Sequence, residues 1–388
     1  MFTRHRRVGL LAAGAACALA LAACGSSSSG GTSGASSGTN AGSGTSTGQL
    51  SAAKAGAAKY RSVPTSIVQS TPLTSAPPKK KVAFVACADP NCANLATFFK
   101  QAATALGWDT ITVSATATDP GSAIQQAIDA GANYIATTGY PVALYQTKMN
   151  EAKAKNIPVF MCYSTDVPGG PSNNLYSDCN DSSAAAVYAK AMADYLAVDS
   201  GGKGNILAVT IPSYPILSAQ VTAAKDELST NCAGCKFHSL EVTTDDLAGS
   251  KVPQAVASYL QSNPSINYVY FTYNGLETGV PAALKAAGLA SKVKLVGTQG
   301  NQPQFQEVAS GTSKAWTALP EELAMWTMAD QMARLSVKQW SSADERKAAI
   351  PPFYFVDTPA AATAVAAEKA GWPGPTGFQE TFKKLWGA

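Results

Sequence analysis

The chain has 388 residues, of which 14% are charged, with 29 Lys and Arg against 25 Asp and Glu. Without the three arginines of the first seven residues the balance is 26 to 25, because 29 − 3 = 26. A chain so close to neutral lacks the basic footprint of nucleic-acid-binding proteins, so we expect no nucleic-acid partner. Its length suffices for two domains of medium size.

The first 23 residues have the layout of a secretory signal peptide. Three arginines precede an apolar stretch, residues 8–20, which is too short to span a bilayer comfortably, and small residues follow it. Residues 21–24, LAAC, resemble a bacterial lipobox, in which Cys24 is lipidated and becomes the first mature residue. The alternative is an ordinary cleavage site beside a chance cysteine. We expect an extracytoplasmic protein that is lipid-anchored to the bacterial cell membrane.

The segment that follows Cys24 has the composition of a flexible tether. Residues 25–49 are almost wholly Gly, Ser, Thr and Ala. Such a segment cannot bury enough apolar surface to offset its chain entropy. We therefore predict that residues 24–79 consist of the lipidated cysteine and a disordered tether, with a mean reach of roughly 40 Å.

From Lys81 onward, short apolar runs alternate with helical periodicity. Asp119 is the expected N-cap of a helix whose first position is Pro120. Strands are predicted at 81–86, 109–115, 133–138 and 157–162, and helices at 94–108, 119–131 and 142–156. This alternation is typical of parallel α/β sheets.

The same order of elements recurs in the second half of the chain. Strands are predicted at 204–210 and 235–242, with a helix at 218–230 between them. The segments 252–272 and 284–298 each correspond to a helix followed by a strand in the first half. Two similar α/β halves predict two lobes with a cleft between them. Ligands of such sheets bind at the carboxyl ends of the strands, so loops from both halves would line one site.

Six cysteines remain for an oxidising compartment after Cys17 leaves with the signal peptide and Cys24 carries lipid. Six cysteines allow fifteen pairings. Local spacing favours Cys87–Cys92, Cys162–Cys179 and Cys232–Cys235. The last pair has CxxC spacing, which also occurs in redox motifs and in half zinc sites. The chain has no second CxxC and only two histidines, so we expect a structural disulfide, no metal and no cofactor.

At this point the sequence resembles a known family. The lipobox, the tether, the duplicated halves, KVAFV at 81–85, IPVFM at 157–161 and KLVGT at 294–298 are similar to type I periplasmic binding proteins. The ribose- and galactose-type solute-binding proteins of ABC importers are the nearest family we can name. The resemblance covers about residues 80–388.

The resemblance implies an α/β fold of two Rossmann-like lobes with parallel sheets, joined by three crossovers. We place the crossovers near residues 177–180, near Leu319 and near Ile350. The N-terminal lobe would then comprise 80–178 plus 320–349, and the C-terminal lobe 179–319 plus 350–388.

The resemblance also implies which strand-end loops line the ligand pocket. A disulfide across CADPNC, residues 87–92, would pre-organise the loop after the first strand and reduce the entropy lost on binding. Trp326, on an amphipathic segment, is expected in the core. The predicted ligand-binding residues are Asp89, Asn91, Thr138, Tyr140, Tyr163, Ser164, Tyr214, Ser218, Asn274, Gln299 and Glu321.

The chain departs from the sugar-binding members of the family at specific positions. Where those relatives carry an Asp-Arg pair, this chain has Tyr163 and Ser164, and Gln299 stands where they usually carry Asp. No arginine lies between Arg61 and Arg334. Because Arg is the side chain best shaped to bind carboxylates and phosphates, we expect a neutral or cationic polar solute, sugar-like, polyol-like or heterocyclic.

We therefore expect the monomeric, lipid-anchored substrate-binding protein of an ABC importer, which closes around a small-molecule ligand by hinge motion. Its partners would be a permease and the ATPase subunits that consume ATP. A sensor that presents ligand to a signalling receptor is an alternative. A thiol-disulfide oxidoreductase using Cys232 and Cys235 is the other. No other enzyme is expected, because His238 is the sole histidine after the signal peptide and lies in a predicted strand.

Overall fold

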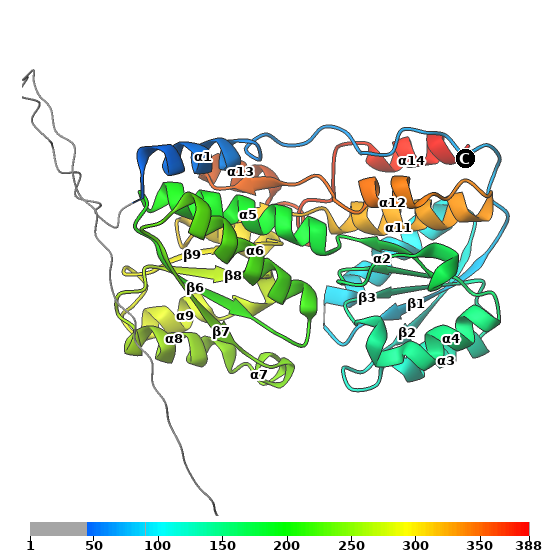
Figure 1. The fold of residues 1–388 in the computed structure, drawn as a ribbon, viewed down its shortest axis with the longest axis horizontal. Coiled ribbons are helices and arrows are strands. Elements are labelled where there is room, and N and C mark those ends of the chain that lie inside the picture. Colours follow the sequence, from blue (N-terminus) through cyan, green and yellow to red (C-terminus); the bar gives the residue numbers. More distant parts are fainter. Residues whose placement is uncertain (1–44, 90, 388) are drawn as a thin grey trace, which may run out of the picture. The chain divides into compact units, whose positions relative to one another are not determined.

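A computed structural model describes residues 45–89 and 91–387. They form two α/β lobes, each built on one sheet (Figure 1). The predicted signal peptide, Cys24 and the predicted tether up to residue 44 lie outside the described residues.

The N-terminal lobe, called the N-lobe, contains a five-stranded parallel sheet in the order β2-β1-β3-β4-β5. Its strands are β1 (Lys81–Ala86), β2 (Asp109–Ser114), β3 (Tyr134–Thr138), β4 (Val159–Cys162) and β5 (Leu175–Cys179). Its helices are α2 (Asn91–Ala105), α3 (Pro120–Asp129), η1 (Val142–Tyr145), α4 (Gln146–Ala154), η2 (Gly170–Ser172), α11 (Glu321–Ser336), α12 (Ser342–Ala348) and α14 (Phe378–Trp386).

The C-terminal lobe, called the C-lobe, contains a six-stranded sheet in the order β11-β10-β9-β8-β6-β7. Its strands are β6 (Asn205–Thr210), β7 (Lys236–Glu241), β8 (Tyr268–Phe271), β9 (Lys294–Gly297), β10 (Ser313–Ala318) and β11 (Tyr354–Val356). Its helices are α1 (Thr47–Ala58), α5 (Ser182–Asp199), α6 (Pro215–Asn231), α7 (Thr244–Ala248), α8 (Val252–Ser262), η3 (Asn274–Leu276), α9 (Val280–Ala286), α10 (Gln302–Ser310) and α13 (Pro359–Val365).

The duplication predicted from the sequence is visible in the strand order. Strands β6 to β10 repeat the arrangement of β1 to β5, and β11 adds an antiparallel edge beside β10. Central strands such as β1, β3 and β8 are largely apolar and buried because helices cover both faces, whereas the edge strands β2 and β7 have only partly buried and exposed positions. The α/β fold class and the two-lobed organisation are therefore confirmed.

The chain passes between the lobes where strands or helices end. It leaves β5 through Asn180 to enter α5, leaves β10 through Leu319 to enter α11, and returns from α12 to β11. The backbone N–H of Asn180 donates to the carbonyl of Ala349 at 2.7 Å, so the first and third of these connections lie side by side.

The prediction of a disordered tether is wrong for residues 45–79. Ser46 begins α1 with a capping box that includes Gln49. Ala53 and Ala57 are buried in the C-lobe core, and the ring of Tyr60 stacks on Phe353 with centroids 4.3 Å apart. The reason is local composition: residues 50–60 are rich in alanine, which favours helix and allows close packing on the alanine-rich α5.

Residues 61–79, which we call the strap, connect α1 in the C-lobe to β1 in the N-lobe (Figure 1). The carbonyl of Thr71 accepts a hydrogen bond from Arg334, and the N–H of Leu73 donates to the carbonyl of Leu385 at 2.7 Å. The backbone N–H of Thr74 donates to the side chain of Gln339 at 2.7 Å. These contacts hold the strap on the N-lobe.

The expected lobe boundary is also wrong at the C-terminus. Residues 350–388 were assigned to the C-lobe, but α14 packs into the N-lobe core beside α11. Trp386 stacks on Trp326 at 5.5 Å, which places Trp326 in the core as expected. The physical reason is that Phe378, Phe382 and Trp386 recur at helical spacing and need an apolar partner.

The first prediction concerns α1. Deletion of residues 45–59 from the full chain is expected to lower Tm by several degrees, because it exposes the C-lobe surface that Ala53 and Ala57 cover. Differential scanning calorimetry measures this. The matched control lacks a stretch of equal length, residues 28–42, and should melt like the parent. Equal Tm values for both deletions would contradict a structural role for α1.

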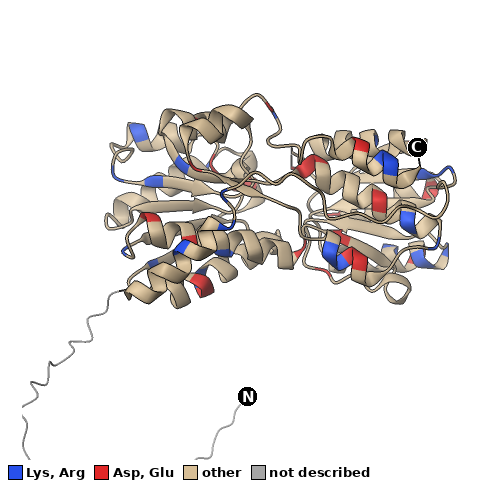
Figure 2. Ribbon diagram, turned by 90° about the horizontal axis from the view of Figure 1, so that it is seen from above, with Lys and Arg blue, Asp and Glu red and all other residues tan. Residues whose placement is uncertain are grey.

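Acidic and basic residues are interspersed over both lobes in Figure 2. Between residues 45 and 387, no helix combines the length and the apolar character that a membrane crossing requires. Within the same part of the chain, no group of three or more His, Cys, Asp or Glu side chains is arranged to hold a metal ion.

Candidate ligand-binding site

The site is built from loops at the carboxyl ends of strands in both lobes. The N-lobe contributes the loops after β1, β3 and β4, and the first residue of α11. The C-lobe contributes the loops after β6, β8 and β9, which are the equivalents of the first three. Parallel sheets present these ends together, so the duplicated fold converges on one place.

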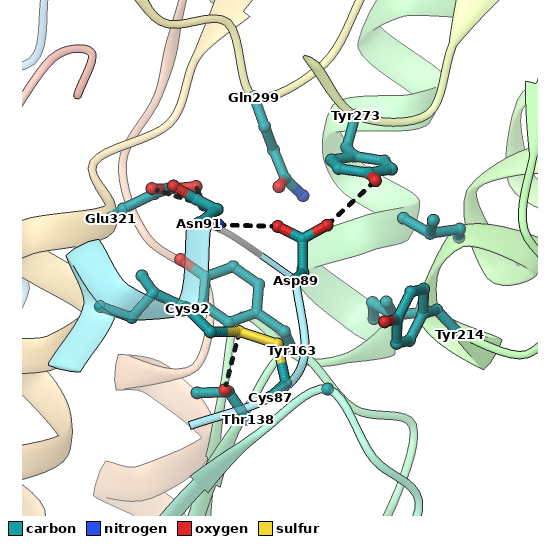
Figure 3. Close-up of a pocket in the computed structure, with 14 residues that line it drawn as sticks. Cys87, Asp89, Asn91, Cys92, Thr138, Tyr163, Tyr214, Tyr273, Gln299 and Glu321 are labelled. Carbon is teal, nitrogen blue, oxygen red and sulfur yellow. Dashed lines mark hydrogen bonds between the residues drawn. A yellow bond between two sulfur atoms is a disulfide. The ribbon is translucent and has the colours of Figure 1, made fainter. Parts of the chain in front are cut away.

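These loops enclose a cavity of about 80 Å³, called the inner cavity (Figure 3). It is lined by Cys87, Asp89, Asn91, Cys92, Leu95, Thr138, Gly139, Tyr163, Tyr214, Ile216, Leu217, Tyr273, Gln299 and Glu321. A wider hollow of about 780 Å³, called the outer cleft, shares Asp89, Asn91, Tyr214 and Tyr273 with it and extends to α7. The inner cavity is therefore the end of a larger interlobe cleft.

A disulfide between Cys87 and Cys92 closes the loop after β1 on the cavity wall. Within this loop, Asp89 Oδ1 accepts the backbone N–H of Asn91 at 2.8 Å. The Asn91 side-chain amide in turn donates to both carboxylate oxygens of Glu321, at 2.8 and 3.0 Å. The loop, the disulfide and α11 therefore form one hydrogen-bonded wall (Figure 3).

A second disulfide supports Tyr163. Cys162, at the end of β4, is bonded to its neighbour Cys179 at the end of β5. The next residue, Tyr163, has a left-handed backbone with φ of 62°, and its N–H donates to the Cys179 carbonyl at 2.9 Å. A non-glycine residue adopts this conformation only where its surroundings determine it, so the disulfide-linked strand ends hold the backbone of Tyr163 in place.

The two lobes touch across the site through tyrosines. The hydroxyl of Tyr273, after β8, donates to Asp89 Oδ2 of the N-lobe at 3.1 Å (Figure 3). The rings of Tyr140 and Tyr214, one from each lobe, lie 6.4 Å apart. These are contacts between neutral donors, aromatic rings and a carboxyl group, and a ligand that enters the inner cavity meets the same groups.

Burial dominates the electrostatics of the cavity. The pKa of Glu321 is raised to about 7, because the effect of burial outweighs the hydrogen bond from Asn91, which lowers it, and the negative charge of Asp89 adds a smaller increase. Burial also raises the pKa of Tyr273 well above its usual range, and the neighbouring Asp89 adds to this effect. The tyrosine hydroxyls therefore remain neutral donors, while Glu321 changes its protonation near neutral pH.

The structure brings most of the predicted residues together. Asp89, Asn91, Thr138, Tyr163, Tyr214, Gln299 and Glu321 line the inner cavity.

Four predicted residues lie elsewhere. Asn274 lines the outer cleft, and its amide donates to the Gln299 carbonyl. Tyr140 is buried beneath the cavity wall, where its hydroxyl accepts the Ala88 N–H at 3.0 Å. Ser164 is buried against Asp166 inside the N-lobe, because the turn at Tyr163 directs the next residue away. Ser218 lines neither hollow, since it lies on α6 one residue beyond Leu217.

One polar residue of the inner cavity wall and several apolar ones were not predicted from the sequence. Tyr273 immediately precedes Asn274 at the end of β8, so its strand-end position was the signal that could have found it. Ile216 and Leu217 lie in the first turn of α6, where an apolar residue is as consistent with the lobe core as with the cavity wall. The sequence alone does not distinguish these two positions.

The third disulfide, Cys232–Cys235, lies away from the site in the loop before β7. Cys232 is buried, and the hydroxyl of Thr45 lies 3.4 Å from its sulfur. Thr45 also accepts the Gly234 N–H at 2.8 Å. The structure thus forms all three pairings favoured by local spacing, and this one fixes the loop on which the chain before α1 rests.

Solved structures with this fold are plentiful, and three are informative. A carbohydrate transporter from Acidothermus cellulolyticus in complex with myo-inositol is 18% identical, with a TM-score of 0.63, and covers 75% of this chain and 98% of its own. An ABC sugar transporter subunit from Rhodobacter sphaeroides is 17% identical, with a TM-score of 0.61, and covers 72% and 98%. A solute-binding protein from Agrobacterium vitis with bound allitol is 16% identical, with a TM-score of 0.62, and covers 74% and 98%.

No curated protein sequence matches the chain. The model of the periplasmic binding protein domain matches residues 83–339, which include most of both lobes and every residue of the inner cavity wall. That family and the structural neighbours are solute-binding proteins and not enzymes, so the oxidoreductase alternative is set aside. Membership implies an extracytoplasmic location. By its domain match, its duplicated strand order and its interlobe cavity, the chain belongs to the periplasmic binding protein family and has the type I fold.

Proposed function

We propose that this protein is the substrate-binding protein of an ABC importer, anchored by lipid at Cys24, and that it captures a small neutral or cationic polar solute between its lobes. The observation that carries the proposal is the inner cavity, which lies where strand ends of both lobes converge. Structural neighbours with this fold hold myo-inositol, allitol and 5-methylthioribose, which are all small polar solutes.

Ligand binding would shift the lobes from an open to a closed arrangement, with Asn180, Leu319 and the segment after α12 as hinges. A ligand that contacts both Asp89 and Tyr273 binds the closed form better than the open one, and this difference in affinity drives the shift. A membrane permease would then recognise the closed form, and its ATPase subunits would supply the energy.

The wall chemistry determines which solutes we expect. Three tyrosines and the amides of Asn91 and Gln299 offer aromatic faces and hydrogen bonds, which suit hydroxylated rings and heterocycles. Asp89 and Glu321 oppose anions. Phosphate esters and dicarboxylates are therefore not expected to bind.

A thermal-shift screen of the purified full-length protein tests this function. Sugars, polyols, nucleosides and amines form one group, and organic acids and sugar phosphates form the other. We expect a saturable rise in Tm with a member of the first group only, and native mass spectrometry of gently purified protein should show the same class of compound. No response in either group, and no co-purified solute, would contradict the proposal.

A further inference from the structure

The whole interlobe cleft is acidic. The carboxyl groups of Asp89 and Glu321 line the inner cavity, and that of Asp245 lines the outer cleft. Of the described residues that line either hollow, none is Lys, Arg or His. The walls of both hollows thus carry negative charge and no positive charge.

The acids of the inner cavity meet only neutral donors inside the protein. Asp89 accepts hydrogen bonds from the backbone N–H of Asn91 and the hydroxyl of Tyr273, and Glu321 accepts from the side-chain amide of Asn91 (Figure 3). The nearest arginines along the chain are engaged elsewhere: Arg61 pairs with Asp357 at 2.6 Å, and Arg334 pairs with Asp330 at 2.8 Å. No described residue of the cavity wall therefore supplies a cation to these carboxyl groups, and a cationic ligand can supply it.

The rest of the wall suits an ammonium group that is attached to a hydroxylated body. Tyr163, Tyr214 and Tyr273 present aromatic rings to the cavity, and the faces of such rings attract cations. Thr138 and Gln299 are neutral and buried, and they offer a hydroxyl and an amide for ligand hydroxyls.

The cavity volume limits the size of the bound group. The inner cavity, at roughly 80 Å³, is about a tenth as large as the outer cleft, at roughly 780 Å³. A compact charged group fits inside the inner cavity, and any longer part of a ligand lies in the outer cleft.

We propose that the ligand of this site is a small hydroxylated amine that carries one ammonium group, held between Asp89 and Glu321. This assignment rests on the solute-binding function proposed above and narrows it to the cationic members of the class. A neutral sugar satisfies the hydrogen bonds but leaves both carboxyl groups without a counter-charge, whereas an ammonium group also supplies an attractive charge.

The test uses matched probes with the full-length protein and isothermal titration calorimetry. The first series is glucose, glucosamine and N-acetylglucosamine, which place a hydroxyl, an ammonium and a neutral amide on one ring. The second is myo-inositol beside an amino-inositol, and the third is ethylene glycol beside ethanolamine. We expect the amine to bind at least about ten times more tightly than its neutral partners in every series that binds.

Isosteric variants locate the effect. Asp89→Asn and Glu321→Gln should each weaken amine binding at least about tenfold more than they weaken the binding of the neutral probes. The matched control is Asp226→Asn, which removes the same charge from an exposed position on α6 and should change neither. Each variant's Tm is measured first, so a loss of folding is not mistaken for a loss of binding.

The pH dependence of amine affinity distinguishes a charge effect from a change in packing, because packing alone does not depend on pH between pH 6 and 8. The pKa of Glu321 is raised to about 7 in the free protein, and Asp89 and Tyr163 are the titratable groups that face it. The pH series uses ethanolamine, whose amine stays protonated throughout this range, because the amine of glucosamine titrates within it. The ammonium group favours the carboxylate, so ethanolamine affinity should fall as the pH is lowered from 8 to 6, with proton release on binding. Glu321→Gln should abolish both effects.

The outcomes separate the two proposals. Equal or tighter binding of the neutral probe in every series that binds, or a co-purified neutral solute, would overturn the amine assignment and leave the solute-binding function standing. If no series binds but the wider thermal-shift screen finds a neutral ligand, the amine assignment is likewise overturned and the solute-binding function still stands. If neither the titrations nor the thermal-shift screen detects binding, both the amine assignment and the solute-binding function are overturned.

Discussion

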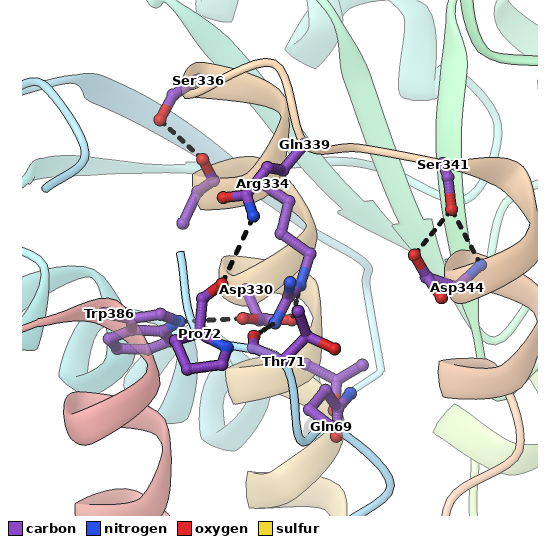
Figure 4. Close-up of polar contacts among 12 residues, drawn as sticks. Gln69, Thr71, Pro72, Asp330, Arg334, Ser336, Gln339, Ser341, Asp344 and Trp386 are labelled. Atoms are coloured by element: carbon purple, nitrogen blue, oxygen red, sulfur yellow. Dashed lines mark hydrogen bonds and ion pairs between the residues drawn. The ribbon is translucent and has the colours of Figure 1, made fainter. Parts of the chain in front are cut away.

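Replacement of Arg334 by methionine is expected to lower the free energy of unfolding by about 3–5 kcal/mol. Arg334 Nε donates to Asp330 Oδ2 at 2.8 Å, and both side chains are buried, at 6% and 0% exposure (Figure 4). Burial raises the pKa of Asp330 even with the arginine beside it, so loss of that partner leaves a carboxyl group buried without counter-charge.

The same arginine holds the strap. Its terminal nitrogen donates to the Thr71 carbonyl at 2.9 Å, and the indole of Trp386 donates to the other oxygen of Asp330 (Figure 4). The substitution therefore weakens the contacts of the strap and of α14 with α11 together. Chemical denaturation monitored by tryptophan fluorescence measures the change.

Two further variants make this prediction decisive. Arg346→Met is the matched control, because Arg346 is exposed on α12, and it should change stability by less than about 0.5 kcal/mol. The double variant Asp330→Asn with Arg334→Met should recover part of the loss, since no buried charge remains. Equal effects of Arg334→Met and Arg346→Met would show that the buried pair does not stabilise the N-lobe.

Leu217→Trp is expected to abolish solute binding, with a loss of affinity of about 100-fold or more. Leu217 lies in the first turn of α6, and its side chain lines the inner cavity. An indole in its place occupies a large share of the roughly 80 Å³ available, so ligand and side chain cannot both fit. Isothermal titration with the strongest binder from the thermal-shift screen measures the loss.

Leu217→Met is the control, because it keeps the volume and the apolar character of the side chain. It should bind the same solute within about threefold of the parent. Tm should change little in Leu217→Met, whereas the larger indole of Leu217→Trp is expected to lower Tm because Leu217 is only 5% exposed. Titrations are therefore made well below the Tm of each variant. Undiminished binding by Leu217→Trp would place the site outside the inner cavity.

The site was partly predictable because its polar residues come from strand ends. Thr138 is the last residue of β3, and Asp89, Tyr163 and Gln299 follow β1, β4 and β9. The alternation of apolar runs and helices in the sequence locates those strand ends. The position of Ser164 away from the cavity was not predictable from the sequence. It depends on the left-handed backbone conformation of Tyr163, which the disulfide-linked ends of β4 and β5 hold in place. Ile216 and Leu217 were not predictable either, because they line a cavity only together with residues of the opposite lobe.

The sequence by itself determined the local features of this protein. The buried strands, the duplicated order of elements, the three short-range disulfides and the absence of arginine between Arg61 and Arg334 follow from composition and spacing, which act over a few residues at a time. The tertiary structure decided where the two ends of the described chain lie. An alanine-rich segment and an aromatic helix bury apolar surface only against a suitable partner, and the partners, α5 for α1 and α11 for α14, are far away in the sequence. It also decided that Asp89 and Glu321 share one cavity, because hydrogen bonds through Asn91 join residues more than 200 positions apart.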